Sequence, residues 1–427
     1  MTPGIANNHS DQPANPGDVA LPARSSWARG WSALRHRDFR LLWAGMFLSN
    51  AGSWMQKVAT AWLVYQMTGS EAWLGIDAFA SGIPTVLLLP LGGVIADRID
   101  RRTLLIWTNL ILAILALLLA GLEAGGVLQV WHIIAVSAAS GVVQSVMVPA
   151  GTSLLPKLVG EEDVPNAIAL NSLQFNLSRV VGPAVGGVTL VYLGAAWSFG
   201  LNALSFIVLV LAFIFIKTVP PVPSSKESVW KSLKGGLMFV RDRSDLAMLL
   251  LLVVATALLG APVVSMLPAL VKMVLHREAT SYSMLLSAFG AGAVVAGLLI
   301  AMLDKGSTRR WLTYLPLIVL GVAEAALGFG GSLWLATTLV AVSGLTFVGT
   351  MIRLGTAILQ TTPDEFRGRV TAFQQMAFRA AQPLGALLAG TIARALGVPI
   401  AFWSFGLVLI LCIICVALWH GHRGREC

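Results

Sequence analysis

Twelve stretches of this sequence are long enough and apolar enough to cross a lipid bilayer. Crossing about 30 Å of hydrocarbon takes about twenty residues of helix. Inside hydrocarbon every backbone amide needs an internal partner, so runs of this length are predicted to be helices. Only 11% of the residues are charged, against roughly a quarter in soluble domains, which excludes a water-soluble globule. The stretches are 41–67, 73–96, 104–122, 127–154, 167–193 and 197–216, followed by 246–271, 282–303, 311–329, 333–356, 370–396 and 400–419.

The first six stretches and the last six look like copies of one another. Arg37-Asp38 recurs as Arg241-Asp242, at an offset of 204. The four-residue change to an offset of 200 falls in a loop, where length differences are cheap. At that second offset the repeated pairs are Gln174 and Gln374, Arg179 and Arg379, and Pro183 and Pro383. The sequence therefore predicts an all-α membrane protein with 12 transmembrane helices in two parallel, pseudo-symmetric six-helix bundles.

Five regions follow from this pattern. Residues 1–33 lack apolar runs and are rich in Pro, Asn and Ser, so we expect a disordered cytoplasmic tail. Residues 34–216 are expected to form the N-terminal six-helix bundle, and residues 246–419 the C-terminal one. Between them, residues 217–245 are expected to form a cytoplasmic linker, with an amphipathic helix that turns its cations towards anionic lipid. Residues 420–427 are the expected cytoplasmic tail at the other end.

The positive charges lie mostly on one side of the predicted helices. Of the 29 Lys and Arg residues, only Lys272, Arg277 and Arg394 fall in regions on the opposite side. By the positive-inside bias, both termini are expected in the cytoplasm, and the expected location is a bacterial inner membrane. Because the cations lie in loops between apolar runs, the formal charge of +9 does not indicate a nucleic-acid partner. Membrane lipid is the expected neighbour, and a monomer is the expected state.

No cofactor, metal or catalytic site is expected. The three cysteines are too few for a disulfide framework, and Cys412 and Cys415 lie within an apolar run as packing residues. His132 and His276 are the only histidines outside the terminal regions, and no metal-ligand pair shares a helix face. The sequence contains no phosphate-binding loop of the Gly-x-x-x-x-Gly-Lys type, so ATP is not expected to drive the protein. We therefore expect no enzymatic activity.

The loop after the second predicted helix carries a family signature. Its residues are Gly93, Asp97, Arg98, Asp100, Arg101 and Arg102. This loop resembles the signature of the major facilitator superfamily, in which Gly-x-x-x-Asp-Arg precedes a short basic run. Other segments are similar to the branch of enterobactin-type siderophore exporters and macrolide exporters, namely Asn50–Gln56, Pro149-Ala150, Leu154–Pro156, Pro165–Ala167 and Arg367–Val370. The resemblance covers residues 34–419 and implies a transporter that moves its substrate outward.

A segment of the fifth predicted helix resembles the signature associated with drug:proton antiporters. Gly182, Pro183, Gly186 and Gly187 match its Gly-Pro-x-x-Gly-Gly core, while Ser178 stands where the family has a further glycine. The glycines let a neighbouring helix approach closely, and the proline bends or loosens its own helix. Since this physical role suits any tight helix pair, antiport is implied by the resemblance alone.

The signature loop is expected to act as a latch on the cytoplasmic side. The duplication places Val370 at the start of the eleventh helix, and Asp97 facing that helix end would gain about 0.3 to 1 kcal/mol from its dipole. These contacts exist only while the cytoplasmic side is shut, so they bias an equilibrium between two conformations. An alternative for the neighbouring arginines is that they only set topology. The arginines expected to hold Asp364 and Glu365 are Arg98, Arg101 and Arg102.

Several polar residues fall within the predicted spans. Arg179 and Arg379 lie near the midplane, where an ionised group must face a wet cavity or a partner. One hypothesis is that they attract an amphiphilic organic anion or a polyphenolic, siderophore-like molecule. The alternative is that each arginine ties helix ends or unwound carbonyls together. Further residues expected to line this cavity are Gln56, Lys57, Gln144, Gln174 and Gln374.

Two carboxylates within the spans are candidates for proton coupling. Asp77 lies near the outer end of the second span, and Glu324 lies in the outer half of the ninth. A carboxylate withdrawn from water can take up and release a proton as it alternates between the two sides. The expected function is thus proton-coupled export of a small organic molecule by alternating access. A non-transporting receptor or scaffold on the same fold stays open, as does an importer or uniporter, because fold does not establish function.

Overall fold

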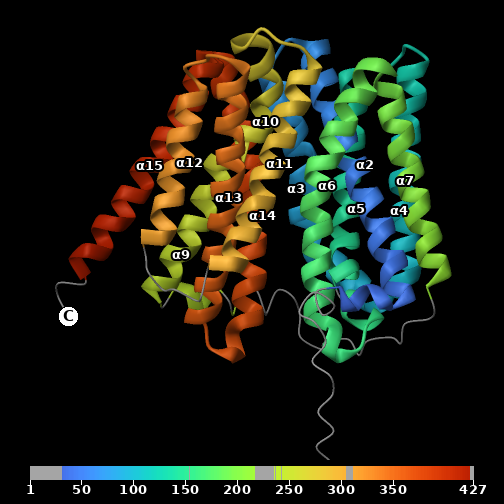
Figure 1. Cartoon of the computed structure of the whole chain (residues 1–427), viewed down its shortest axis with the longest axis horizontal. Coiled ribbons are helices and arrows are strands. Elements are labelled where there is room, and N and C mark those ends of the chain that lie inside the picture. Colours follow the sequence, from blue (N-terminus) through green and yellow to red (C-terminus); the bar gives the residue numbers. More distant parts are fainter. Residues whose placement is uncertain are drawn as a thin grey trace, which may run out of the picture.

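Long helices make up most of the structure (Figure 1). It is a computed structural model that describes residues 31–152, 154–216, 235, 237–241, 243–303 and 311–423. No strand occurs within these ranges. The linker helix expected within 217–245 falls largely outside them, as do residues 1–30 of the predicted tail and residues 424–427.

Six helices form the N-terminal half. They are α2 (Arg37–Thr68), α3 (Glu71–Arg98), α4 (Arg101–Ala124), α5 (Val130–Thr152), α6 (Val164–Tyr192) and α7 (Ala195–Phe215). Short 3-10 turns precede α2 and join α5 to α6, namely η1 (Ser32–Arg35), η2 (Leu155–Leu158) and η3 (Glu161–Asp163). Gly69 adopts a positive φ of 58° and ends α2, which permits the tight turn into α3.

The C-terminal half begins with one helical stretch that changes type along its length. It comprises α9 (Ser244–Ala255), the π-helical η4 (Thr256–Gly260), α10 (Pro262–Ala269) and the π-helical η5 (Leu270–Val274). Pro262 and Pro268 lack backbone N–H groups, and the wider π turns on either side of α10 accommodate this interruption. The remaining helices are α11 (Ala279–Leu303), α12 (Trp311–Leu327), α13 (Leu333–Thr361), α14 (Asp364–Leu396) and α15 (Val398–Arg423).

Eight of these helical stretches are long and apolar enough to cross a membrane. They are α3, α4, α5, α7, the stretch Ser244–Val274, α11, α13 and α15, while α12 contributes a shorter apolar segment. The helices α2, α6 and α14 fall outside this group and carry interior polar residues such as Asn50, Gln174 and Gln374. Twelve transmembrane spans therefore stay a prediction, whereas the all-α membrane fold is confirmed.

The two halves pack against each other mainly through two pairs of helices. Helix α3 lies against α14, and α6 lies against α11 (Figure 1). At the offsets of the internal repeat, α3 corresponds to α11 and α6 corresponds to α14. Each contact is therefore the counterpart of the other under exchange of the halves, as the predicted parallel duplication requires.

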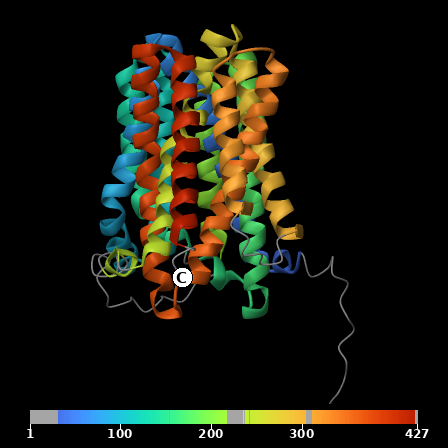
Figure 2. The same cartoon turned by 90° about the vertical axis from the view of Figure 1, so that its left-hand side faces the viewer.

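Helix α2 begins and α15 ends at the same end of the molecule (Figures 1 and 2). We call this end the predicted cytoplasmic end and the opposite one the predicted outer end. The ribbons of the two halves meet near the predicted outer end and diverge towards the predicted cytoplasmic end (Figure 1). The division of the chain into five regions and its orientation in the membrane stay predictions.

Hydrogen bonds tie the start of α2 to the start of α6. The backbone N–H of Ala33 donates to Oδ1 of Asn166 at 3.0 Å, and Nε2 of His36 lies 2.8 Å from Oδ2 of Asp163. Hydrogen bonds from Ser32 and His36 hold the pKa of Asp163 below its usual value. Because that pKa is lowered, the contribution of Asp163 to the tie is present above about pH 4 and is lost only as the pH falls through the lower, folded value.

We expect the Asp163→Asn protein at pH 7 to exchange the backbone amides of residues 33–40 faster than the unsubstituted protein. The unsubstituted protein should keep this protection down to about pH 4, since its carboxylate stays ionised. Hydrogen–deuterium exchange with mass spectrometry, corrected for the intrinsic pH dependence of exchange, measures the difference. Glu161→Gln, an exposed acid in the same turn, is the matched control. Equal exchange in all three proteins would show that the contact contributes nothing.

Candidate functional site

The contact between α3 and α14 brings two main chains together near the predicted outer end. A Cβ atom on Gly75 would lie 2.7 Å from the carbonyl oxygen of Ala386, and one on Gly82 would lie 2.8 Å from the ring of Pro383. A Cβ on Gly390 would lie 2.6 Å from the carbonyl oxygen of Glu71. Only glycine permits such an approach without displacement of the neighbouring helix.

The contact between α6 and α11 is equally close. A Cβ on Gly290 would lie 2.5 Å from the carbonyl oxygen of Arg179, and the Ser287 hydroxyl donates to the carbonyl oxygen of Val180 at 3.2 Å. Gly187, part of the segment that resembles the antiporter signature, packs on Ser283 of α11. This glycine therefore serves the contact between the halves.

The other residues of that segment face α2 within the N-terminal half. A Cβ on Gly182 would lie 2.6 Å from the carbonyl oxygen of Ala51, and one on Gly186 would lie 3.0 Å from Cα of Met55. Pro183 is buried within α6. The geometry agrees with the predicted close helix approach, and whether these residues serve antiport stays a prediction.

An aromatic pair joins the two halves on the predicted outer side. The rings of Trp62 on α2 and Tyr282 on α11 stack with their centroids 6.3 Å apart. Nζ of Lys272 lies 5.9 Å from the Trp62 ring and 2.8 Å from Glu278. Lys272 was expected on this side, but Trp62 and Tyr282 carry no signal in the sequence, because aromatic side chains within apolar runs suit an interface as well as a lipid-facing surface.

Arg179 lies between aromatic rings from the two halves. Its guanidinium carbon is 5.3 Å from the ring of Trp54 on α2 and 5.4 Å from the ring of Phe289 on α11. Its Nε is buried and has no hydrogen-bond partner in the described part of the chain. Nζ of Lys57 lies 4.7 Å from the same Trp54 ring. Two cations from two helices therefore share one aromatic ring.

Asp77 belongs to the same group of charges. Its Oδ1 accepts a hydrogen bond of 2.6 Å from the hydroxyl of Ser137 on α5. It is close enough to Lys57 for electrostatic attraction, and Lys57 is also close enough to Arg179 for repulsion. Asp77 was expected apart from the cavity residues, and the structure places it beside one of them, Lys57, which in turn lies near Arg179. We call Lys57, Asp77 and Arg179 the central charge cluster.

The remaining residues predicted to line the cavity have other surroundings. Gln56 accepts a hydrogen bond of 2.6 Å from Asn202. Gln174 is buried, where it accepts a bond of 3.3 Å from Asn50 and donates one of 3.2 Å to Asn171. These two glutamines therefore bond within the N-terminal half.

The counterparts in the C-terminal half stand apart from the central charge cluster. Gln374 is buried next to Gly355, and Arg379 is half-buried. Gln144, on α5 of the N-terminal half, is also half-buried. For Arg379 no hydrogen bond or ion pair occurs among the described residues, and no contact joins it to Arg179. The structure therefore unites Arg179 with Lys57 and leaves its symmetric partner separate.

Glu324 lies inside the C-terminal half, away from the central charge cluster. Only 1% of its surface is exposed, and neither carboxylate oxygen has a hydrogen-bond partner among the described residues. It lines a small cavity together with Pro262, Met266 and Phe402. The two carboxylates nominated for proton coupling thus have different neighbours, and only Asp77 lies beside cations.

The signature loop makes contacts within its own half. Asp97 is exposed and lies 3.8 Å from Arg101, whose Nη1 is buried without a hydrogen-bond partner in the described ranges. Arg102 donates to the carbonyl oxygens of Phe213 and Ile214 at 2.7 and 2.6 Å, which fastens α4 to the end of α7. Asp100 accepts from the backbone N–H of Thr103 at 2.9 Å and caps α4. Gly93 is half-buried, and Arg98 is exposed.

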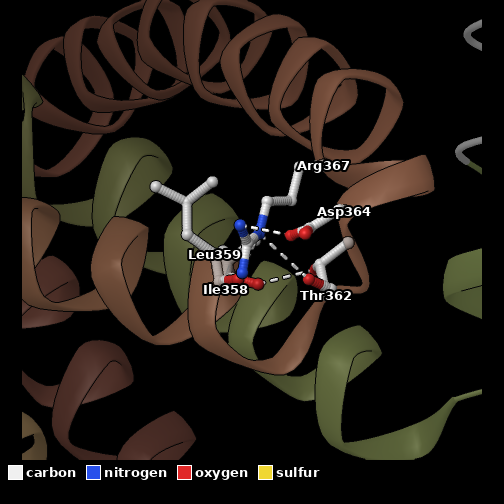
Figure 3. A network of polar contacts seen from close by, with 5 residues as sticks. All are labelled: Ile358, Leu359, Thr362, Asp364 and Arg367. Atoms are coloured by element: carbon white, nitrogen blue, oxygen red, sulfur yellow. Dashed lines mark hydrogen bonds and ion pairs between the residues drawn. The ribbon is translucent and has the colours of Figure 1, made fainter.

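The first turn of α14 is held by its own half in the same way. Arg367 donates to the carbonyl oxygens of Leu359 and Thr362 at 3.3 and 3.2 Å and forms an ion pair with Asp364 (Figure 3). The Thr362 hydroxyl in turn donates to the carbonyl oxygen of Ile358 at 2.6 Å (Figure 3). The last carbonyls of α13 are therefore satisfied by this arginine, a common way to end a helix.

The face of α3 that contacts α14 also carries the predicted latch residues. Gly75, Gly82, Gly93 and Asp97 recur at helical intervals and share one face of α3. Since α3 and α14 run antiparallel, continuing the pairing of Gly75 with Ala386 towards the predicted cytoplasmic end would bring Asp97 opposite the first turns of α14 if the two faces closed there. Ala372 lies on the α14 face that carries Pro383, and it is exposed in this structure.

We expect Gly75→Leu to destabilise the folded protein, because the new side chain meets the α14 backbone. Overpacking of this kind costs about 1 to 3 kcal/mol. A thermal unfolding curve of the detergent-purified protein should show a lower midpoint temperature. Gly121→Leu is the matched control, since nothing lies within 4 Å of a Cβ at that position. Equal midpoints for both variants would contradict the close contact.

Comparison with known proteins places the chain in a family. Residues 28–422 match the model of the transmembrane secretion effector family. The enterobactin exporter EntS of Citrobacter koseri is 28% identical over 431 residues, covering 94% of this chain and 97% of that protein. The multidrug efflux pump Tap of Mycolicibacterium fortuitum is 28% identical over 381 residues, covering 85% of this chain and 91% of that protein.

Solved structures share the fold. The nucleoside transporter NupG has a TM-score of 0.71 and 14% identity, covering 89% of this chain and 98% of that one. A bacterial homologue of the human lysosomal transporter Spinster, in an inward-facing and unoccupied conformation, has a TM-score of 0.68 and 14% identity, covering 90% of this chain and 95% of that one. From the family match along nearly the whole chain, together with this fold, the chain belongs to the transmembrane secretion effector family and is an integral membrane transporter of the major facilitator superfamily.

Proposed function

We propose that the protein exports a small, drug-like or siderophore-like organic anion with an aromatic part. The observation that carries this proposal is Arg179, a guanidinium with a buried, unbonded Nε, held between Trp54 of one half and Phe289 of the other. An arginine within a membrane is costly unless it meets a partner or water. An anion with an aromatic ring would supply the missing acceptor and would stack on the same side chains.

The direction of transport rests on the relatives. Two proteins similar along most of this chain are named as an enterobactin exporter and a multidrug efflux pump. We propose the same outward direction here, across a bacterial inner membrane and with both termini in the cytoplasm. A non-transporting receptor on the same fold predicts no flux from proteoliposomes.

We propose that export proceeds by alternating access of the central charge cluster. The halves touch through Gly75 and Gly290, at the level of the cluster and on its predicted outer side. Asp97 and Ala372, at the predicted cytoplasmic end, are exposed. A rocking of one half on the other would bring the latch face of α3 onto α14 and separate the outer contacts. The exposed fraction of Ala372 would fall in that second conformation.

We propose that protons act on transport through Asp77, not through Glu324. Asp77 accepts a hydrogen bond from Ser137 and lies beside Lys57, so a change in its charge alters the site itself. Glu324 faces a separate cavity inside the C-terminal half. A change in its charge would affect the stability of that half before it affected the substrate.

We expect Asp97→Asn to shift the protein towards the conformation described here. Loss of the interaction with the start of α14 removes about 0.3 to 1 kcal/mol, a population change of about two- to fivefold. In a background without cysteines, Ala372→Cys should react faster with a maleimide when Asp97→Asn is added. Glu162→Gln, an exposed acid on the same side, is the control. Identical labelling rates with and without Asp97→Asn would show that Asp97 does not act as a latch.

We expect Arg179→Gln to weaken binding of an aromatic anion about 10- to 100-fold, because a charge-assisted hydrogen bond contributes about 1.5 to 3 kcal/mol. Efflux of naphthalene-1-sulfonate from proteoliposomes that contain the full chain measures the loss. Arg394→Gln, an exposed arginine of the predicted outer side, should keep the original rate. Full efflux by a normally folded Arg179→Gln protein would refute the proposed site, and Arg379→Gln tests its symmetric partner in the same way.

A further inference from the structure

The central charge cluster carries an excess of positive charge. In their ionised forms Lys57 and Arg179 contribute two positive charges and Asp77 contributes one negative charge, which leaves a net charge of one positive. Arg379, half-buried on α14, stands apart from the cluster and is not counted in this balance. Glu324 does not enter this balance because it faces a cavity inside the C-terminal half.

We propose that the transporter is electrogenic, with the membrane potential as its driving force and the central charge cluster as its voltage-sensitive element. The inference rests on the proposed function, because it takes the substrate to be an anion and the mechanism to be alternating access. A bound monovalent anion neutralises the cluster, so the loaded site turns outward without electrical work. The empty site carries its positive charge, so a potential that is negative inside returns it to the cytoplasmic side. Each cycle moves one negative charge outward.

The size of this effect follows from the charge and the potential. A site that opens to one compartment lies at the electrical potential of that compartment. For one elementary charge and 100 mV, the ratio of inward-open to outward-open empty protein changes by up to about 50-fold. The potential therefore resets the empty carrier and biases transport of the anion outward.

In this proposal, protonation promotes anion binding. Protonation of Asp77 removes the single negative charge of the cluster and strengthens its attraction for an anion. Because coupling is reciprocal, a bound anion also favours protonation of Asp77. An antiporter needs the opposite relation, in which substrate and proton exclude each other. Acid on the outer side alone is therefore expected not to drive export.

The surroundings of Asp77 support the sign of this coupling. The neighbouring helices present Ser137 from α5, Tyr282 from α11 and Lys57 from α2, and Lys57 in turn lies near Arg179. The packed helix α14 carries Arg379 and Arg394, and neither is shown in contact with Asp77 in the described part of the chain. The acid of α3 itself, Glu71, is buried and accepts a hydrogen bond of 3.3 Å from Tyr65. Among the described residues, the charged group of another helix that acts on Asp77 is thus the cation Lys57.

The first test needs no substrate. The full chain, with Cys412, Cys415 and Cys427 replaced by serine and with Ala372→Cys as reporter, is placed in proteoliposomes with a potassium gradient. Addition of valinomycin makes the inside negative. For molecules whose predicted cytoplasmic face lies inside the vesicle, we expect a membrane-permeant maleimide to label the reporter faster, by up to about 50-fold per 100 mV; the opposite orientation should show the opposite change. Lys57→Gln should weaken this response, and Asp77→Asn should strengthen it. Glu324→Gln is the matched control and should leave it unchanged. Labelling that ignores the potential overturns the proposal.

The second test measures flux. Proteoliposomes loaded with naphthalene-1-sulfonate, whose charge does not change with pH, should empty faster when the inside is made negative. An acidic outer solution without a potential should give no such acceleration. Efflux that responds to the pH difference and not to the potential overturns electrogenic export. If naphthalene-1-sulfonate does not move at all, the proposed anion function fails, while the labelling response still decides whether the empty carrier senses voltage.

Discussion

The close approach of main chains at two helix crossings is the constraint on which the rest of the structure depends. In lipid, apolar surface gains nothing by leaving the solvent, so helices associate through tight packing and hydrogen bonds. Gly75 and Gly290 allow α3 to touch α14 and α11 to touch α6. Because these crossings hold the halves together near the predicted outer end, the same faces are free to separate at the other end. The central charge cluster lies between the region where the halves are in contact and the region where they diverge.

The second constraint is the cost of charge in a membrane. Lys57 and Arg179 are placed against the faces of Trp54 and Phe289, so aromatic quadrupoles replace part of the lost hydration. Asp77 lies beside Lys57 and opposes part of this positive charge. Under the proposed function, the remaining positive charge and the aromatic rings would favour an amphiphilic anion over a cation.

The sequence marks the charged residues of the site but not the residues that contact them. Arg179 and Lys57 stand out because cations are rare within apolar runs, and the internal repeat marks Arg179 twice. Trp54 and Phe289 carry no such mark, since an aromatic residue suits a lipid face as well as an interface. Gln174 was assigned to the cavity, yet it bonds to Asn50 within its own half. A polar residue in a span can face a cavity or a neighbouring helix, and spacing along the chain does not separate the two.

The sequence by itself determined that the chain forms long helices in lipid, that six helices are followed by six related ones, and that the basic loops lie on one side. These properties depend on the length, polarity and repetition of segments, which are local or follow from comparison of the chain with itself. Only the tertiary structure decided that α3 meets α14, that Asp77 joins Lys57, and that Glu324 stays apart. A helix has several neighbours, and its sequence fixes which residues share a face but not which helix that face meets.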